Sequence, residues 1–94
     1  MTGVMLVRQR VASISQWNSV FRDPDLDMVR REHGLEVTGT YVDADVPNTV
    51  IVVMNMASLD KAREFAASAE LAAAREQAGA IGAPDGVWFG PQHV

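Results

Sequence analysis

The spacing of hydrophobic side chains divides the chain into segments of two kinds. Residues 4–11 begin with four consecutive apolar side chains and then turn polar, which predicts a first strand. Residues 35–43 alternate between apolar and polar side chains, as in a strand with one covered face. Residues 49–56 are apolar at nearly every position and predict a third strand. Residues 87–89 predict a short fourth strand, which the glycine and proline after it should end.

Two segments between these strands have the 3.6-residue spacing of amphipathic helices. The first follows the first strand and is expected to restart at a proline, which favours the first turn of a helix. The second follows the third strand and has a small inner face rich in alanine. The predicted capping and ending residues are Ser13, Asp23 and Gly34 for the first segment, and Ser58, Ser68 and Gly79 for the second.

These elements follow one another in the order β-α-β-β-α-β, which predicts a single ferredoxin-like α+β domain over residues 1–94. With right-handed crossovers, the four strands make an antiparallel sheet that has both helical segments on one side. The other side of the sheet is then bare. No linker-like stretch divides the chain.

The third strand leaves apolar side chains on that bare side in either register. The alternatives are Val50, Val52, Met54 and Met56, or Ile51 and Val53. Burying one such side chain contributes about 1.5–3 kcal/mol, so several exposed ones forfeit much of the roughly 5–15 kcal/mol by which a domain is stable. A two-fold axis can match such a patch to itself. We therefore expect a homodimer through the open sheet face.

Composition narrows the functional classes. The net charge is −4 and the basic residues are scattered among acidic ones, so nucleic acid is not expected as a partner. Arg30 and Arg31 are interpreted as solvated helix charges. The absence of cysteine excludes disulfides and thiolate chemistry and fits a cytoplasmic protein. The N-terminal residues lack a signal-peptide pattern, and the apolar runs are too short for membrane insertion.

Five stretches together suggest a family. They are SQWNSVF at 15–21, RREHGL at 30–35, YVDADVPNTV at 41–50, AREFAASAEL at 62–71 and AGAIGAPDG at 78–86. They resemble the dimeric α+β barrel superfamily, in particular its small stand-alone proteins near the antibiotic-biosynthesis monooxygenases and the aromatic polyketide cyclases. This resemblance implies two protomers that join their sheets into a barrel, each with a pocket between sheet and helices.

The resemblance also implies a chemistry. Cofactor-independent monooxygenases of this kind commonly pair an asparagine in the third-strand region with a tryptophan a few residues later. Asn55 matches the asparagine, but residues 56–63 contain no tryptophan. The cyclase-like relatives use a histidine from the first helical segment, for which His33 is the candidate. No metal or cofactor is expected, because the two histidines of the chain cannot by themselves build a conventional metal site.

Three residues are the catalytic candidates, and each has a structural alternative. His33 could transfer a proton, or it could bind the last carbonyls of the helix that ends at Gly34. Asn55 could orient a ligand oxygen, or satisfy the end of its own strand. Tyr41 shares one face of the alternating strand with Leu35 and Val37, where it could offer its phenol to a ligand or lie at the edge of an interface.

The substrate-binding candidates are mainly aromatic. Trp17 and Phe21 belong to the apolar stripe of the first helical segment and could line a pocket or simply fill the core. Trp88 could form a pocket floor or pack in the barrel. Arg8 could bind an anionic group or lie at a solvated strand end or dimer rim.

The leading hypothesis is a small cofactor-independent enzyme that acts on an apolar, aromatic or polyketide-like substrate. The alternative is a non-catalytic dimer that binds a small ligand or serves in assembly. A roomy cavity with several convergent polar side chains would favour the enzyme, and a filled core would favour the alternative.

Overall fold

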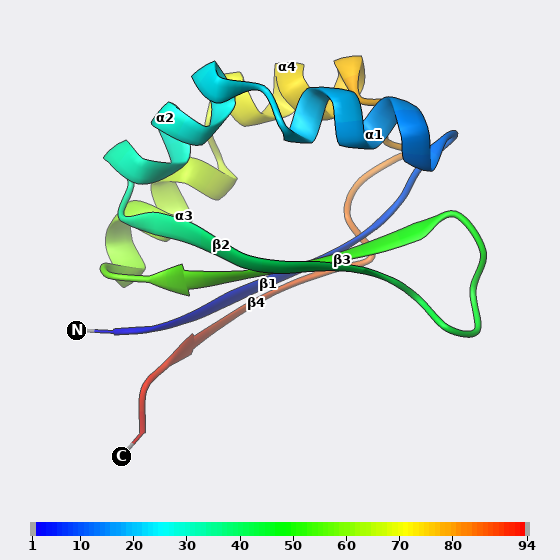
Figure 1. Cartoon of the computed structure of the whole chain (residues 1–94). Coiled ribbons are helices and arrows are strands. Elements are labelled where there is room, and N and C mark those ends of the chain that lie inside the picture. Colours follow the sequence, from blue (N-terminus) through cyan, green and yellow to red (C-terminus); the bar gives the residue numbers. More distant parts are fainter. Residues whose placement is uncertain (1, 94) are drawn as a thin grey trace.

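The computed structural model describes residues 2–93. Its elements are β1 (Gly3–Arg10), α1 (Ile14–Phe21), α2 (Pro24–Glu32), β2 (Leu35–Val42), β3 (Thr49–Met56), α3 (Leu59–Ala66), α4 (Ala69–Gln77) and β4 (Gly86–Pro91). The strands form an antiparallel sheet in the order β2-β3-β1-β4, and the helices cover one face of it (Figure 1). This confirms the predicted ferredoxin-like α+β fold.

The helices start and end where the sequence predicts. Each predicted capping side chain accepts a hydrogen bond from the backbone N–H of a residue two or three positions later. The capping residues are Ser13, Asp23, Ser58 and Ser68. Gly34 and Gly79 have φ of 70° and 80°, a left-handed conformation that ends each helical pair at low steric cost. Every helix in residues 2–93 falls short of the length and apolarity that crossing a bilayer requires.

The two faces of β3 explain why its sequence is apolar at almost every position. Its buried side chains point toward the helices and are Val50, Val52, Met54 and Met56. The remaining apolar side chains, Ile51 and Val53, belong to the face of the sheet that has no helices, which we call the open face. Each central strand therefore carries apolar residues on both faces.

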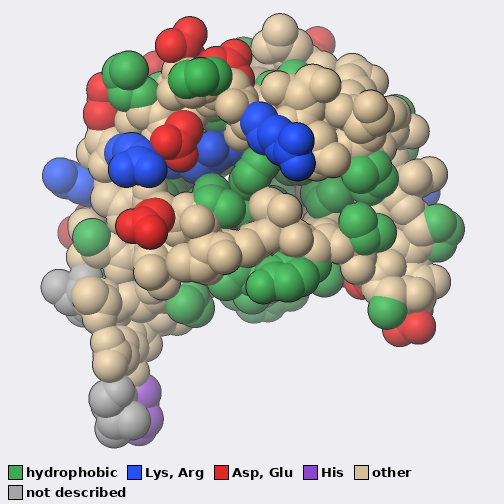
Figure 2. Space-filling view, viewed as in Figure 1, with side chains coloured by type: hydrophobic (Ala, Val, Ile, Leu, Met, Phe, Trp, Pro, Cys, Tyr) green, Lys and Arg blue, Asp and Glu red, His purple; other side chains and the backbone are tan. Residues whose placement is uncertain are grey.

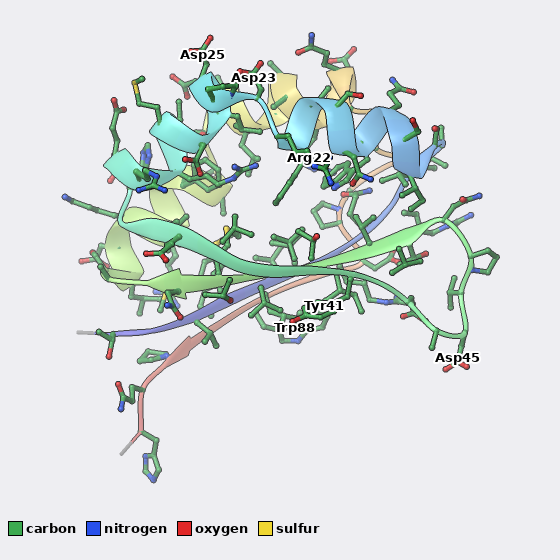
Figure 3. All side chains as sticks on the ribbon, in the orientation of Figure 1. Arg22, Asp23, Asp25, Tyr41, Asp45 and Trp88 are labelled. Carbon is green, nitrogen blue, oxygen red and sulfur yellow. The ribbon has the colours of Figure 1, made fainter. Side chains whose placement is uncertain are left out.

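The prediction that Tyr41 shares a face of its strand with Leu35 and Val37 is wrong. The pairing of β2 with β3 shifts between Val37 and Gly39, so one residue of β2 is left out of the register. This irregularity reverses the facing of the strand beyond it. Leu35 and Val37 pack toward the helices, whereas Tyr41 lies on the open face (Figure 3).

The predicted end of the last strand is also wrong. Strand β4 extends from Gly86 to Pro91, and Pro91 pairs with Gly3 of β1. Proline is tolerated there because β4 is an edge strand, so its missing N–H faces no further neighbour.

The open face is apolar and carries two exposed aromatic rings. Hydrophobic side chains gather below the sheet in Figure 2, and Tyr41 and Trp88 project there in Figure 3. Tyr41 is 58% and Trp88 53% exposed. A Cβ atom added to Gly39 or Gly86 would clash with the ring two residues later, so each ring covers the glycine of its own edge strand.

Candidate functional site

A cavity of about 230 Å³ lies between the sheet and the helices. The floor comes from alternate residues of β1 and β3, which are Met5, Val7, Val52 and Met54. Ala66 of α3, Ala74 of α4 and Ala78, which caps α4, present only methyl groups to the cavity. These alanines leave the space open, because a methyl group cannot reach across to the sheet.

Trp17 and Phe21 form an aromatic wall of the cavity. They are one helical turn apart on α1, and their rings stack with centroids 6.3 Å apart and planes 22° apart. Trp17 is only 8% exposed. The helical stripe predicted from the sequence therefore places both residues at the same cavity, and both belong to the core as well.

Arg30 is part of the same wall, and its interpretation as a solvated charge is wrong. The residue is 4% exposed, its guanidinium lies 4.2 Å from the centroid of the Phe21 ring, and its Nη2 donates to the Phe21 carbonyl at 2.9 Å. Its Nη1 lies 3.6 Å from an Asp27 carboxylate oxygen. Burial lowers the pKa of Arg30, although Asp27 opposes this effect. The i, i+4 spacing from Leu26 was the sequence signal for this buried position.

Replacing Arg30 with lysine should destabilise the protein. Lysine lacks the planar group that both stacks on Phe21 and donates to its carbonyl. We expect a loss of about 1–2 kcal/mol, since buried charged hydrogen bonds and desolvated cation–π contacts are each of that order. Chemical denaturation measures it, with Arg31→Lys as the matched control, because Arg31 is exposed and pairs with the same Asp27. Equal stability of the two variants would contradict the assignment.

Arg75 is the second cation at the cavity, and sequence analysis gave it no role. Its Nη2 donates to Oε1 of Gln9 at 2.8 Å and to the Gly82 carbonyl at 2.7 Å. Gln9 is 1% exposed on the helix-covered face of β1. No sequence signal indicated this contact, because 66 residues separate the two partners.

His33 lies at the end of α2 rather than in the cavity. Its Nδ1 is 2.8 Å from the Val29 carbonyl oxygen, and its ring is tilted against Phe65 with centroids 5.5 Å apart. A carbonyl oxygen only accepts, so Nδ1 carries the proton and donates it. This contact is the helix-end role weighed for the residue, while Phe65 connects the ring to the cavity wall.

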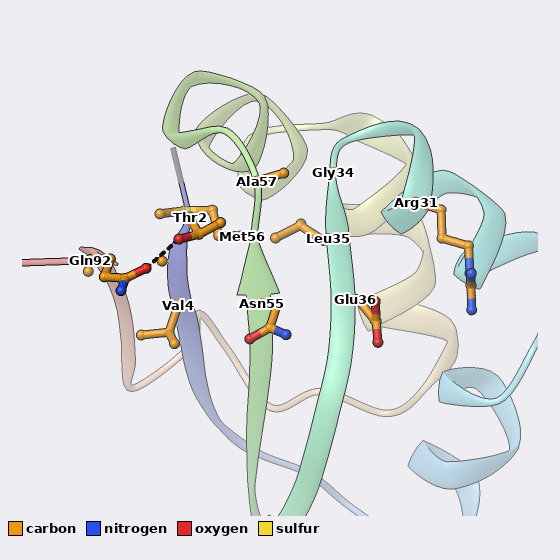
Figure 4. A pocket seen from close by; sticks show the side chains of 12 residues that line it. Thr2, Val4, Arg31, Gly34, Leu35, Glu36, Asn55, Met56, Ala57 and Gln92 are labelled. Atoms are coloured by element: carbon orange, nitrogen blue, oxygen red, sulfur yellow. Dashed lines mark hydrogen bonds between the residues drawn. The ribbon is translucent and has the colours of Figure 1, made fainter. Parts of the chain in front are cut away.

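Asn55 lies in a second, open groove of about 660 Å³ at the end of the sheet (Figure 4). The groove is lined by Val4 of β1, Glu36 of β2 and Asn55 of β3, together with Gln92, which follows the end of β4. Asn55 is exposed and pairs in register with both Val4 and Glu36. Its side chain is therefore solvent-accessible and separated from the aromatic wall.

Arg8, Tyr41 and Trp88 all lie on the open face. Arg8 makes ion pairs with Asp43 at 3.2 Å and Asp85 at 3.1 Å, so it connects the two edges of the sheet. Its neighbours in register are Ile51 and Gly86. This location corresponds to the strand-end or dimer-rim alternative for Arg8.

Asp43 should stabilise the 43–48 turn in a pH-dependent way. Backbone N–H groups of Asp45 and Val46, followed by Arg8, lower its pKa below the ordinary value of 3.8. A lowered pKa means that the stabilisation is present above the ordinary value and is lost as the pH falls through the lowered one. Asp43→Asn should therefore lower the melting temperature at pH 7, and the difference from the natural chain should shrink below pH 3.8. A difference that does not depend on pH would contradict this.

The structure thus distributes the predicted site residues over several places. Trp17 and Phe21 are together at the cavity, whereas Asn55 is in the groove and His33 is at the end of α2. Tyr41 lies beyond the sheet from the cavity. Within one protomer the three catalytic candidates therefore do not converge on a common point.

Several solved structures are similar to this chain. A proposed antibiotic biosynthesis monooxygenase from Bordetella bronchiseptica matches with a TM-score of 0.73 and 17% identity, over 99% of this chain and 97% of its own. One from Caulobacter crescentus gives 0.68 and 18%, over 94% and 86%. A nipsnap family protein of unknown function from Agrobacterium tumefaciens gives 0.64 and 14%, over 96% and 87%. The predicted resemblance is therefore confirmed at the level of the fold.

Sequence comparison adds nothing to this. No protein-family model matches the chain, and no curated protein matches it.

Proposed function

We propose that this protein is a small cofactor-independent enzyme, monooxygenase-like or cyclase-like, that acts on an apolar aromatic or polyketide-like substrate. The observation that carries the proposal is the cavity between sheet and helices, with its stacked wall of Trp17 and Phe21. An apolar space with an aromatic wall and few polar groups suits a planar ring system. The shared fold with proposed antibiotic biosynthesis monooxygenases supports this reaction class.

We also propose that the functional unit is a homodimer joined through the open faces. Leu6, Ile51 and Val53 form an apolar strip along the two central strands, bordered by the exposed rings of Tyr41 and Trp88 on the two edge strands. These rings lie at opposite edges, which suits pairing about a two-fold axis. A second copy would remove this apolar surface from water.

Oxygen consumption tests the proposed activity. The natural chain, treated with chelator and supplied with no flavin or haem, should accelerate the oxidation of anthrone by O₂ to anthraquinone and water. Trp17→Ala should lower kcat/KM at least about tenfold, because it removes the aromatic wall that holds the ring system. Met28→Ala is the control for loss of a large apolar side chain outside both the cavity and the open face. Unchanged kcat/KM in the Trp17 variant would contradict the location of the site.

The roles predicted for Asn55, His33 and Tyr41 need a separate variant. If Asn55 and Tyr41 orient an oxygen and His33 moves a proton, replacing all three should abolish turnover. If turnover is unchanged, catalysis does not depend on them, and the cavity remains the proposed site.

A non-catalytic ligand-binding dimer is the second candidate. The observation that favours it is the separation of the three catalytic candidates, since the cavity itself presents mainly apolar groups and two guanidinium groups. Tight binding of aromatic compounds without turnover of anthrone or any related substrate would support this function over the enzyme.

A further inference from the structure

The polar character of the cavity comes from two arginines. Arg30 and Arg75 contribute to its lining, and among residues 2–93 no carboxylate does so. The rest of the lining is made of apolar and aromatic side chains. The cavity lining is therefore largely apolar and contributes positive charge. The net charge of −4 of the whole chain does not indicate this.

The two arginines differ in how completely they are paired. Arg30 has Asp27 beside it and donates to the Phe21 carbonyl. Arg75 donates through Nη2 to Gln9 and Gly82, but its Nε is buried and has no hydrogen-bond partner among the described residues. Within the same residues, no carboxylate lies within 4.0 Å of its guanidinium. Arg75 thus has one enclosed donor without a partner, and its guanidinium, on a partly exposed residue, has no carboxylate beside it among these residues.

An enclosed donor without an acceptor, such as Nε of Arg75, is energetically unfavourable. A buried N–H without an acceptor loses its hydration and gains nothing in return, and the loss is larger when the group is charged. An oxygen that carries negative charge, bound at the part of the guanidinium that lines the cavity, would supply the missing counter-ion. The apolar lining strengthens this attraction, since charges interact more strongly away from water.

Gln9 holds Arg75 in place for this role. The Gln9 amide donates through Nε2 to the carbonyl oxygens of Arg10 at 2.8 Å and Ile81 at 3.3 Å, which fixes its Oε1 as the acceptor for Arg75. Gln9 is fully enclosed, so this orientation cannot relax into solvent. The guanidinium is consequently positioned before a ligand arrives, and little ordering remains to oppose binding.

We propose that the cavity selects small aromatic ligands that bear an anionic oxygen, a carboxylate or a phenolate, and that Arg75 is the residue that binds this oxygen. The inference rests on the proposed function in one respect, namely that the cavity is the ligand site. It adds the substrate class: acidic aromatic compounds rather than neutral hydrocarbons. Trp17 and Phe21 contact the rings, and Arg75 determines which ring compounds are retained.

Calorimetry with a matched pair of probes tests this. The probes are 2-naphthoate and its neutral methyl ester, which share the ring system and differ in charge. At pH 7 the natural chain should bind the carboxylate about 10- to 100-fold more tightly, the range that charged hydrogen bonds usually give. Arg75→Met should remove this preference and leave ester binding within about threefold. Arg22→Met, a charge removal at an exposed position, should leave the preference intact.

Two further measurements keep the outcome clear. Ala74→Phe, which fills the cavity, should weaken both probes and so show that they bind there. Because Arg75 also holds the loop at Gly82, the melting curve of Arg75→Met is recorded, and Arg75→Lys serves as a second variant that keeps the charge and lacks the planar guanidinium. The lysine variant should lose at least half of the preference, expressed as a free energy.

The failures are distinguishable. If the natural chain binds both probes equally and Ala74→Phe abolishes binding, the role of Arg75 is wrong, while the cavity remains a site for aromatic compounds. If neither probe binds, both the role of Arg75 and the cavity as ligand site are wrong.

Discussion

Leu6→Glu should convert the protein from a dimer to a monomer at micromolar concentration. Leu6 lies at the centre of the open face, between Val53 of β3 and Trp88 of β4. A carboxylate there would be buried against the same apolar strip of a second copy without a partner, which costs about 3–5 kcal/mol, or a factor of roughly 10² to 10⁴ in Kd. Sedimentation velocity over a concentration series measures the change.

Thr40→Glu is the matched control for this variant. Thr40 pairs with Val52 and is therefore on the helix-covered side of the sheet, where it is exposed at the edge. The same charge there should leave the dimer unaffected. If Leu6→Glu and Thr40→Glu have equal dissociation constants, the open face is not the interface.

Phe65→Ala should cause the largest loss of stability in the protomer. Phe65 is 2% exposed, lines the cavity and contacts the His33 ring. Removing a buried phenyl group costs about 3–5 kcal/mol, because the transfer free energy is lost and the space left behind fills only partly. The free energy of unfolding from urea denaturation should fall by that amount.

The volume removed at position 65 should determine how much stability is lost. Phe65→Leu, which keeps most of the volume, should cost less than half as much. The alanine variant should also accept larger ring systems, because the enlarged space is continuous with the cavity. A loss below about 1 kcal/mol would show that the core does not depend on Phe65.

Most of the fold could be predicted from local rules. Serines and an aspartate at the helix starts, and glycines with positive φ at the ends, act within a few residues, so their signals are visible in the sequence. The irregularity in β2 was invisible, because it depends on how β2 pairs with β3 rather than on β2 alone. It moved Tyr41 to the opposite face and thereby out of reach of the cavity.

The candidate site was less predictable than the fold, because several of its contacts join residues that are far apart in the sequence. Trp17 and Phe21 were found because helical spacing brings them together on one stripe. Arg30 was interpreted as a surface charge because of its residue type, although its i, i+4 spacing from Leu26 indicated the buried side of α2, where the Phe21 ring covers its guanidinium. Arg75 depends on Gln9 from another element, and such long-range polar contacts have no period that a single sequence reveals.

Methionine methyl NMR tests the central claim, that the cavity between sheet and helices is where an aromatic ligand binds. Met5 and Met54 line that cavity, Met56 lines the groove at the end of the sheet, and Met28 is exposed. On addition of 2-naphthoate or its methyl ester, ring currents should shift the Met5 and Met54 methyl resonances and leave Met28 unchanged. Shifts confined to Met56, or none at saturating ligand, would contradict the account.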